Sequence, residues 1–209
     1  SYKLNYDKLF IGITVTAKAY IIIDTITTET ELTTLLSNNS VPCVRLANKG
    51  DDPEDLRRKC DQFRLICHNL EVPFILEDNY EMAKSLGLDG VHLNRDNQDS
   101  ENIIKMVTDE FMIGVDCGHS RHAGLISAEM GASYISFKMP NNQSESESSI
   151  IETELFEWWH QTIEISLVAE GCNTLQQMSA VLKVSDFISI SPTEWRNNEH
   201  FSKINDLLS

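Results

Sequence analysis

The sequence lacks any hydrophobic run long enough to cross a membrane as a helix. Its longest apolar stretch, AYIIID at residues 19–24, is far shorter than the roughly 18 residues that a membrane span needs. The first residues also lack the apolar segment and cleavage site of a secretory signal. We therefore expect a cytoplasmic protein without a membrane partner.

Cysteine is sparse and unpatterned. The five cysteines are scattered along the chain, and no two of them form a CxxC pair. An odd number of cysteines without disulfide or metal-ligand spacing is typical of a reducing compartment. This again favours the cytoplasm.

Positive charge is scarce, with 17 Lys and Arg residues against 32 Asp and Glu residues and a net charge of −15. Binding to nucleic acid without sequence preference depends on cations that neutralise phosphates, so this balance disfavours DNA and RNA as partners. Docking on anionic lipid is disfavoured for the same reason.

The chain does contain a regular alternation of short apolar runs and amphipathic stretches. The apolar runs are rich in β-branched residues, which predicts parallel strands that are buried on both faces. Eight such runs span residues 19–24, 41–47, 72–76, 90–93, 111–116, 133–138, 163–169 and 186–192. Helical patterns separate them, from DPEDLRRKCDQFRLICHNL at 52–70, which begins with acids and a proline, to DSENIIKMVTDE at 99–110 and the last pattern at 193–209.

Eight alternations of strand and helix predict an α/β protein, a (β/α)8 TIM barrel. The alternative is an open, doubly wound sheet of eight strands. We expect residues 1–18 to form an N-terminal extension and residues 19–209 to form a single barrel domain. In a barrel, the loops after the strands build the ligand site, so the polar loop at 141–149 is expected at the functional mouth.

One stretch in the centre of the chain connects this fold to a function. VPFILEDNYEMAKSLGLDGVHLNRDN at 72–97 resembles the central segment of thiamine-phosphate synthase and of its sister, the TenI-type thiazole tautomerase. CVRLANKG at 43–50, MIGVDCGHS at 112–120 and MGASYISF at 130–137 extend the resemblance on both sides. The run DGVHL at 89–93 is its most specific part.

This resemblance implies a reaction between small heterocyclic substrates. Thiamine-phosphate synthase joins an aminopyrimidine methyl diphosphate to a thiazole phosphate and releases diphosphate. The chemistry calls for Mg²⁺ held by carboxylates, for cations on the phosphates, and for backbone N–H groups around the thiazole phosphate. Mg²⁺ is therefore the implied cofactor.

The implied metal and catalytic positions match the family unevenly. Asp78 keeps a metal-binding position, whereas the second metal aspartate is Asn97 here, with Asp96 as the carboxylate beside it. Lys49 keeps a catalytic cation of the family. His119 matches a histidine that resembles a proton-transfer base in tautomerase-type relatives; the alternative is that it merely opens the following helix.

The implied substrate positions have diverged further. Ala47 replaces a family arginine, but Arg45 lies two residues earlier on the same face of the strand, so we expect the positive charge to be relocated. Glu77 replaces an amide that contacts the pyrimidine, and Asp116 replaces a serine and would repel a diphosphate. The substrate-binding positions implied after the last three strands are Lys138, Gly171 and Ser191.

Three functions stay open at this point, and with them whether the protein is an enzyme. The first is a divergent thiamine-phosphate synthase, a transferase. The second is a metal-independent, tautomerase-like enzyme that uses His119. The third is a non-catalytic or regulatory barrel, a pseudoenzyme, that binds a thiamine-related ligand; the acids near the strand ends favour it. Separately, the Trp158–Trp159 pair indicates helix packing on the barrel or a homodimer contact.

Overall fold

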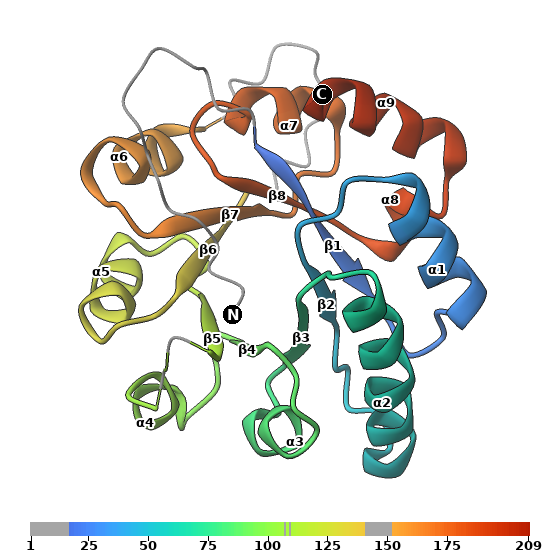
Figure 1. Cartoon of the computed structure of the whole chain (residues 1–209). Helices are drawn as coiled ribbons and strands as arrows, with labels where there is room; N and C mark the ends of the chain where they lie inside the picture. Colours follow the sequence, from blue (N-terminus) through green and yellow to red (C-terminus); the bar gives the residue numbers. More distant parts are fainter. Residues whose placement is uncertain (1–16, 107, 109, 141–151) are drawn as a thin grey trace.

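Eight parallel strands close into a barrel in the computed structural model, which describes residues 17–106, 108, 110–140 and 152–209. Each strand pairs with the next, and β8 pairs back onto β1 (Figure 1). The predicted (β/α)8 barrel is thus confirmed. The strands are β1 Lys18–Ile23, β2 Val44–Leu46, β3 Phe74–Glu77, β4 Gly90–Leu93, β5 Met112–Asp116, β6 Tyr134–Lys138, β7 Ser166–Glu170 and β8 Phe187–Ile190.

Helices follow the strands and form the outer layer of the barrel (Figure 1). None of the helices in the described part of the chain is long and apolar enough to cross a membrane. Their bounds are α1 Glu29–Asn38, α2 Pro53–Asn69, α3 Tyr80–Ser85, α4 Ser100–Ile104, α5 Arg121–Glu129, α6 Glu154–Thr162, α7 Leu175–Val181, α8 Pro192–Trp195 and α9 Asn198–Leu208.

Local hydrogen bonds fix where several helices begin. Thr28 and Glu31 form a reciprocal capping box at the start of α1. The Asp52 side chain accepts the backbone N–H groups of Glu54 and Asp55 in the first turn of α2. The stretch at 193–209 forms two helices rather than one. The Asn197 side chain accepts the backbone N–H of His200 and so starts α9 as a separate helix.

Two predictions fall wholly or largely on residues outside the described ranges. The loop at 141–149 lies outside them, and so does the N-terminal extension apart from its last two residues. Of these two, Lys18 already belongs to β1.

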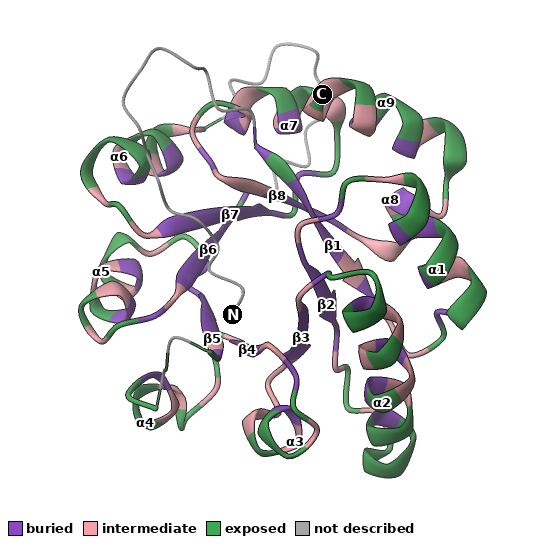
Figure 2. Cartoon of the chain, viewed as in Figure 1, coloured by how far each residue is buried: buried purple, intermediate pink, exposed green. Residues whose placement is uncertain are grey.

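The core has two parts, which the alternation of side chains along the strands separates. The larger part lies between the strands and the helices, whose inner faces are buried while their outer faces are exposed (Figure 2). Trp159 belongs to it, with 1% of its surface exposed against Phe137, which confirms helix packing for this residue. The smaller part, inside the barrel, is formed by Tyr20, Cys43, Ile75, Tyr134 and Val168.

A glycine makes room for the largest side chain inside the barrel. A Cβ atom at Gly114 in β5 would overlap the Tyr134 ring of β6. The absence of a side chain at Gly114 therefore lets the Tyr134 ring lie inside the barrel, where its hydroxyl contacts the Tyr20 hydroxyl and Nδ1 of His92.

The helix α2 provides a direct test of this packing. Phe63 is fully buried and meets the Phe74 ring edge-on, whereas Leu65 on the same helix is 52% exposed. We expect Phe63→Ala to lower the free energy of unfolding by roughly 3–5 kcal/mol, because it leaves a cavity. The control Leu65→Ala should change it by no more than about 0.5 kcal/mol. Urea unfolding measures both values, and equal effects would contradict the proposed seating of α2.

Candidate active site at the mouth of the barrel

A buried ion pair lies beneath the mouth of the barrel. Arg45 in β2 donates from Nη1 to Oε1 of Glu170 in β7 at 2.7 Å, and the two residues are 5% and 8% exposed. The Nε atom of Arg45 lies 3.6 Å from Oε2 of Glu77, and its guanidinium lies over the Tyr20 ring. The charge of Arg45 is thus inside the barrel and already has a counter-ion, and its predicted role on a substrate phosphate stays untested.

The two carboxylates beside Arg45 respond in opposite ways. Burial raises the pKa of Glu170, but the charge and hydrogen bond of Arg45 outweigh this effect and hold that pKa below its usual value. Burial also raises the pKa of Glu77, and there the more distant Arg45 does not offset it. Glu170 is therefore the charged partner of Arg45, and Glu77 is the carboxyl group that takes up a proton more readily.

His92 belongs to a hydrogen-bonded chain inside the barrel. Its Nδ1 lies 3.0 Å from the Tyr134 hydroxyl, which lies 2.7 Å from the Tyr20 hydroxyl. Burial, and after it the positive charge of Arg45, lowers the pKa of His92 well below its ordinary value. His92 is therefore a neutral group of the barrel interior, 1% exposed.

A second ion pair lies at the rim. Lys138, at the end of β6, donates from Nζ to Oδ2 of Asp116 at 2.6 Å, and Oδ1 of Asp116 accepts the backbone N–H of Gly118 at 2.8 Å. Half of the Lys138 side chain is exposed, whereas the Asp116 side chain is buried. The hydrogen bond to Asp116 raises the pKa of Lys138. Asp116 is thus neutralised where the sequence predicted an acid that repels diphosphate.

Asp78, the implied metal ligand, joins the loops after β3 and β4. Its Oδ1 accepts the backbone N–H of Asn94 at 2.8 Å and Nδ2 of Asn97 at 3.1 Å, and its Oδ2 accepts Nδ2 of Asn94 at 2.6 Å. The backbone of Asp78 is left-handed, with φ at 60°. Both oxygens therefore accept hydrogen bonds from groups that belong to the next loop.

The residues around Asp78 fit an Mg²⁺ ion poorly. Mg²⁺ takes six oxygen ligands at short distance, but amide N–H groups face both oxygens of Asp78. The Oδ1 of Asn97 accepts the Asp99 backbone N–H, and Asp96 is exposed. Within the described ranges, no three His, Cys, Asp or Glu side chains group closely enough to hold a metal ion. The metal roles of Asp78 and Asp96 stay predictions.

A cavity of about 430 Å³ opens at the carboxyl ends of β6, β7 and β8. This volume lies within the range of small-molecule sites. The cavity brings together four residues predicted from the sequence, and its lining consists of Ile22, His119, Lys138, Met139, Glu170, Gly171, Cys172, Asn173, Ser189, Ser191 and Glu194. Arg45, Glu77, Asp78 and Asp116 lie outside this lining. Lys49 and Asp96 are exposed, and their predicted roles stay untested.

Sequence reasoning missed Glu194 in this cavity. Its Oε2 accepts the backbone N–H of Ser191 at 2.7 Å, in a capping box that starts α8. The signal was present, because Ser-Pro-Thr-Glu has the spacing of a capping box. Glu170, by contrast, was expected only as one of several acids near the strand ends. Its pairing with Arg45 was not predicted, because no local pattern in the sequence joins the two residues.

These features define a (β/α)8 barrel with a polar cavity at the carboxyl ends of its strands, the position of active sites in TIM-barrel enzymes. The chain belongs to the thiamine monophosphate synthase family, whose sequence model matches residues 14–190. The family resemblance is thereby confirmed.

Known proteins agree with this assignment. Thiamine-phosphate synthase of Erythrobacter litoralis is 31% identical over 157 residues, 72% of this chain and 73% of the relative. That of Rhodospirillum centenum is 27% identical over 169 residues, 79% and 81% of the two chains.

Solved structures support the fold. Thiamine phosphate pyrophosphorylase from Pyrococcus furiosus matches with a TM-score of 0.72 at 18% identity, over 94% of this chain and 99% of that one. N-acetylmannosamine-6-phosphate 2-epimerase from Clostridium perfringens matches with a TM-score of 0.62 at 11% identity, over 91% and 94%. Identities this low show a shared barrel and no more.

The ion pair inside the barrel predicts a strong effect of removing one partner. Glu170→Gln leaves the buried Arg45 charge with only the more distant Glu77 carboxyl group beside it, so we expect the free energy of unfolding to fall by about 3–5 kcal/mol. The double variant Arg45→Met/Glu170→Leu removes both charges and should be much closer to the wild type. Chemical unfolding measures both, and a Glu170→Gln variant as stable as the wild type would contradict the pairing.

The same pair predicts a dependence on pH. Because the folded pKa of Glu170 is lowered, its contribution to stability is complete above the unfolded pKa of about 4.3 and is lost as the pH falls through the folded value. The wild type should therefore lose stability below about pH 4.3 more steeply than the double variant. Unfolding curves between neutral and acid pH compare the two, and parallel losses would count against a lowered Glu170 pKa.

Proposed function

We propose that the protein joins an aminopyrimidine methyl diphosphate to a thiazole phosphate, forming thiamine phosphate and releasing diphosphate. The observation that carries this proposal is the cavity at the ends of β6, β7 and β8. It combines an ammonium group from Lys138, the backbone of Gly171, a hydroxyl from Ser191 and an imidazole from His119. Family membership supports the same reaction.

The proposed reaction breaks one bond and forms another. The carbon–oxygen bond between the pyrimidine methylene and the diphosphate breaks, and the diphosphate leaves with the electron pair. The lone pair of the thiazole nitrogen then forms the new carbon–nitrogen bond. Stabilising the charge of the leaving group is the main task of the protein, and fixed hydrogen-bond donors perform this task well in a site shielded from water.

The cavity suggests how the thiazole phosphate is held. Gly171 has a φ of 72°, and nothing lies within 4 Å of where a Cβ atom would stand, so a phosphate can approach its backbone closely. Ser191 supplies a hydroxyl donor on the neighbouring loop, and Lys138 supplies a positive charge at the rim of the same cavity, where the diphosphate leaves. His119 is exposed in the same cavity, in reach of a ligand proton.

The buried groups suggest the place of the pyrimidine. Glu77 lies at the carboxyl end of β3, and Oε1 already accepts Nδ2 of Asn94 at 2.9 Å. A carboxyl group with a raised pKa can donate to a ring nitrogen and accept from an amino group, which is the pattern that the edge of an aminopyrimidine presents. Arg45 helps to position Glu77, because its Nε lies 3.6 Å from Oε2 of Glu77.

A second function is favoured by the pairing of the cations. Arg45 and Lys138 already have carboxylates at 2.7 and 2.6 Å, and a neutralised cation attracts a diphosphate less strongly than a free one. This observation supports a barrel that binds a thiamine-related ligand without turnover. The tautomerase-like function rests instead on His119 alone, as a base in the cavity.

An assay of product formation tests the proposal. The purified protein, mixed with the two substrates, should form thiamine phosphate, which is detected as a fluorescent oxidation product. Lys138→Met should lower kcat/KM by about 100-fold, as expected when one preorganised charged donor is removed. The control Lys183→Met removes a charge that lies between α7 and β8, at the other end of the barrel, and should leave kcat/KM unchanged.

The alternatives give different results in the same experiment. No product at high protein concentration, together with thermal stabilisation by thiamine phosphate, would favour the binding function. Proton exchange on a thiazole without diphosphate release, lost in His119→Ala, would favour the tautomerase-like function.

A further inference from the structure

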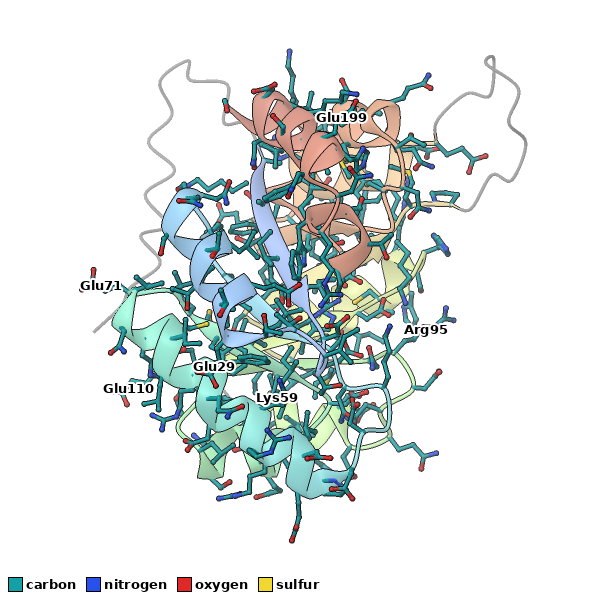
Figure 3. The ribbon with its side chains drawn as sticks, turned by 90° about the vertical axis from the view of Figure 1, so that its right-hand side faces the viewer. Glu29, Lys59, Glu71, Arg95, Glu110 and Glu199 are labelled. Atoms are coloured by element: carbon teal, nitrogen blue, oxygen red, sulfur yellow. The ribbon has the colours of Figure 1, made fainter. Side chains whose placement is uncertain are left out.

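Two exposed cations in the loops after the strands, Lys49 after β2 and Arg95 after β4, form no ion pair within the described part of the chain. Lys138 and Arg196 each bind a carboxylate, as does the buried Arg45, but Arg95 forms no ion pair or side-chain hydrogen bond with any residue in the described ranges. Arg95 is exposed and follows β4. In Figure 3 it lies at the opposite end of the molecule from Glu71 and Glu110, which precede β3 and β5. It therefore belongs to the carboxyl ends of the strands, the end on which the cavity opens.

Gly118 allows Arg95 to approach the loop after β5. A Cβ atom at Gly118 would stand 3.0 Å from Nη1 and 3.5 Å from Cδ of Arg95, and the φ of 55° at Gly118 also favours glycine. The guanidinium group thus lies against a backbone that has no side chain of its own. A larger residue at this position would push Arg95 away.

The same glycine connects Arg95 to the cavity. The Gly118 carbonyl accepts the backbone N–H of Lys138 at 2.8 Å, and Asp116 binds both the Gly118 N–H and the Lys138 ammonium group. Lys138 and His119, the residue after Gly118, line the cavity. Arg95 and Lys138 therefore adjoin one short, hydrogen-bonded segment at the cavity rim.

Asp78 fixes the loop that carries Arg95. Its two oxygens accept three hydrogen bonds from Asn94 and Asn97, which flank Arg95 in the sequence. A loop held on both sides of the arginine reduces the conformational freedom that Arg95 would lose on binding a ligand. The carboxylate that resembles a metal ligand is thus used here to position a cation.

We propose that Arg95 and Lys138 form the subsite for the diphosphate of the pyrimidine substrate, and that Arg95 supplies there the positive charge that a divalent metal would otherwise supply. This inference rests on the proposed function. A guanidinium fork matches the oxygens of a phosphate group and donates two parallel hydrogen bonds to it. The diphosphate leaves with the electron pair of the carbon–oxygen bond while Arg95 stabilises its charge, and no proton is transferred. Asp78 acts as a positioning residue.

Titration calorimetry with inorganic pyrophosphate tests this subsite. The wild type should bind pyrophosphate in the presence of EDTA, and added Mg²⁺ should not tighten binding. Arg95→Ala should weaken binding by about tenfold or more, as expected for the loss of a charge-assisted pair of hydrogen bonds. Arg95→Lys should recover part of the affinity, and the control Lys183→Ala should bind like the wild type.

A further variant tests the replacement of the metal directly. Nδ2 of Asn97 lies 3.1 Å from Oδ1 of Asp78, so Asn97→Asp places a second carboxylate beside the first. Two adjacent carboxylates attract a divalent cation. In Asn97→Asp, pyrophosphate binding should therefore become weaker in EDTA and should be strengthened by Mg²⁺, unlike binding to the wild type.

The outcomes separate this inference from the proposed function. Pyrophosphate binding that needs Mg²⁺ in the wild type, that is absent under all conditions, or that is unchanged in Arg95→Ala overturns the subsite, even if thiamine phosphate is formed. Binding in EDTA that is lost in Arg95→Ala, without any thiamine phosphate in the turnover assay, supports the subsite and overturns the proposed reaction.

Discussion

The buried pair of Arg45 and Glu170 is the interaction on which the mouth of this barrel depends. Removing two charges from water costs several kcal/mol for each ion, and only close, well-oriented contact offsets that cost. The 2.7 Å hydrogen bond provides such contact between β2 and β7. Arg45 also acts on its other neighbours, because its charge helps to keep His92 neutral and reduces, without cancelling, the rise in the pKa of Glu77.

The acidic mouth inferred from the sequence has a different electrostatic character in the structure. Glu170 is neutralised by Arg45, Asp116 by Lys138, and the charge of Asp78 is dispersed over three N–H donors. A field of free carboxylates would favour a cationic ligand. These carboxylates instead act in pairs with groups that they hold in place. Arg95 pairs with no carboxylate in the described ranges, so its charge is open to an incoming ligand.

The sequence predicted the barrel because each buried strand leaves a continuous apolar run, and all eight runs correspond to strands. The sequence predicted the side-chain contacts inside the barrel less well. The alternation of side chains places Arg45 on one face of a strand, but its partner Glu170 lies 125 residues away and no local pattern specifies it. Helix ends were also imprecise. The pattern at 99–110 gives only α4, which ends at Ile104, and Thr108 then pairs with Phe111 in an isolated bridge ahead of β5.

The exchange at Asn97 shows why a single sequence position can be misleading without its neighbours. Loss of a carboxylate from a metal site would by itself reduce the positive charge that the site can hold beside the departing diphosphate. Two carboxylates and one divalent cation carry no net charge, however, and one carboxylate with one arginine carries none either. The change to Asn97 therefore keeps the local charge balanced if Arg95 is present. The new amide also binds Asp78, which holds the loop that carries Arg95. With the proposed subsite, the difference from the family at Asn97 and the exposed cation at Arg95 have one physical explanation.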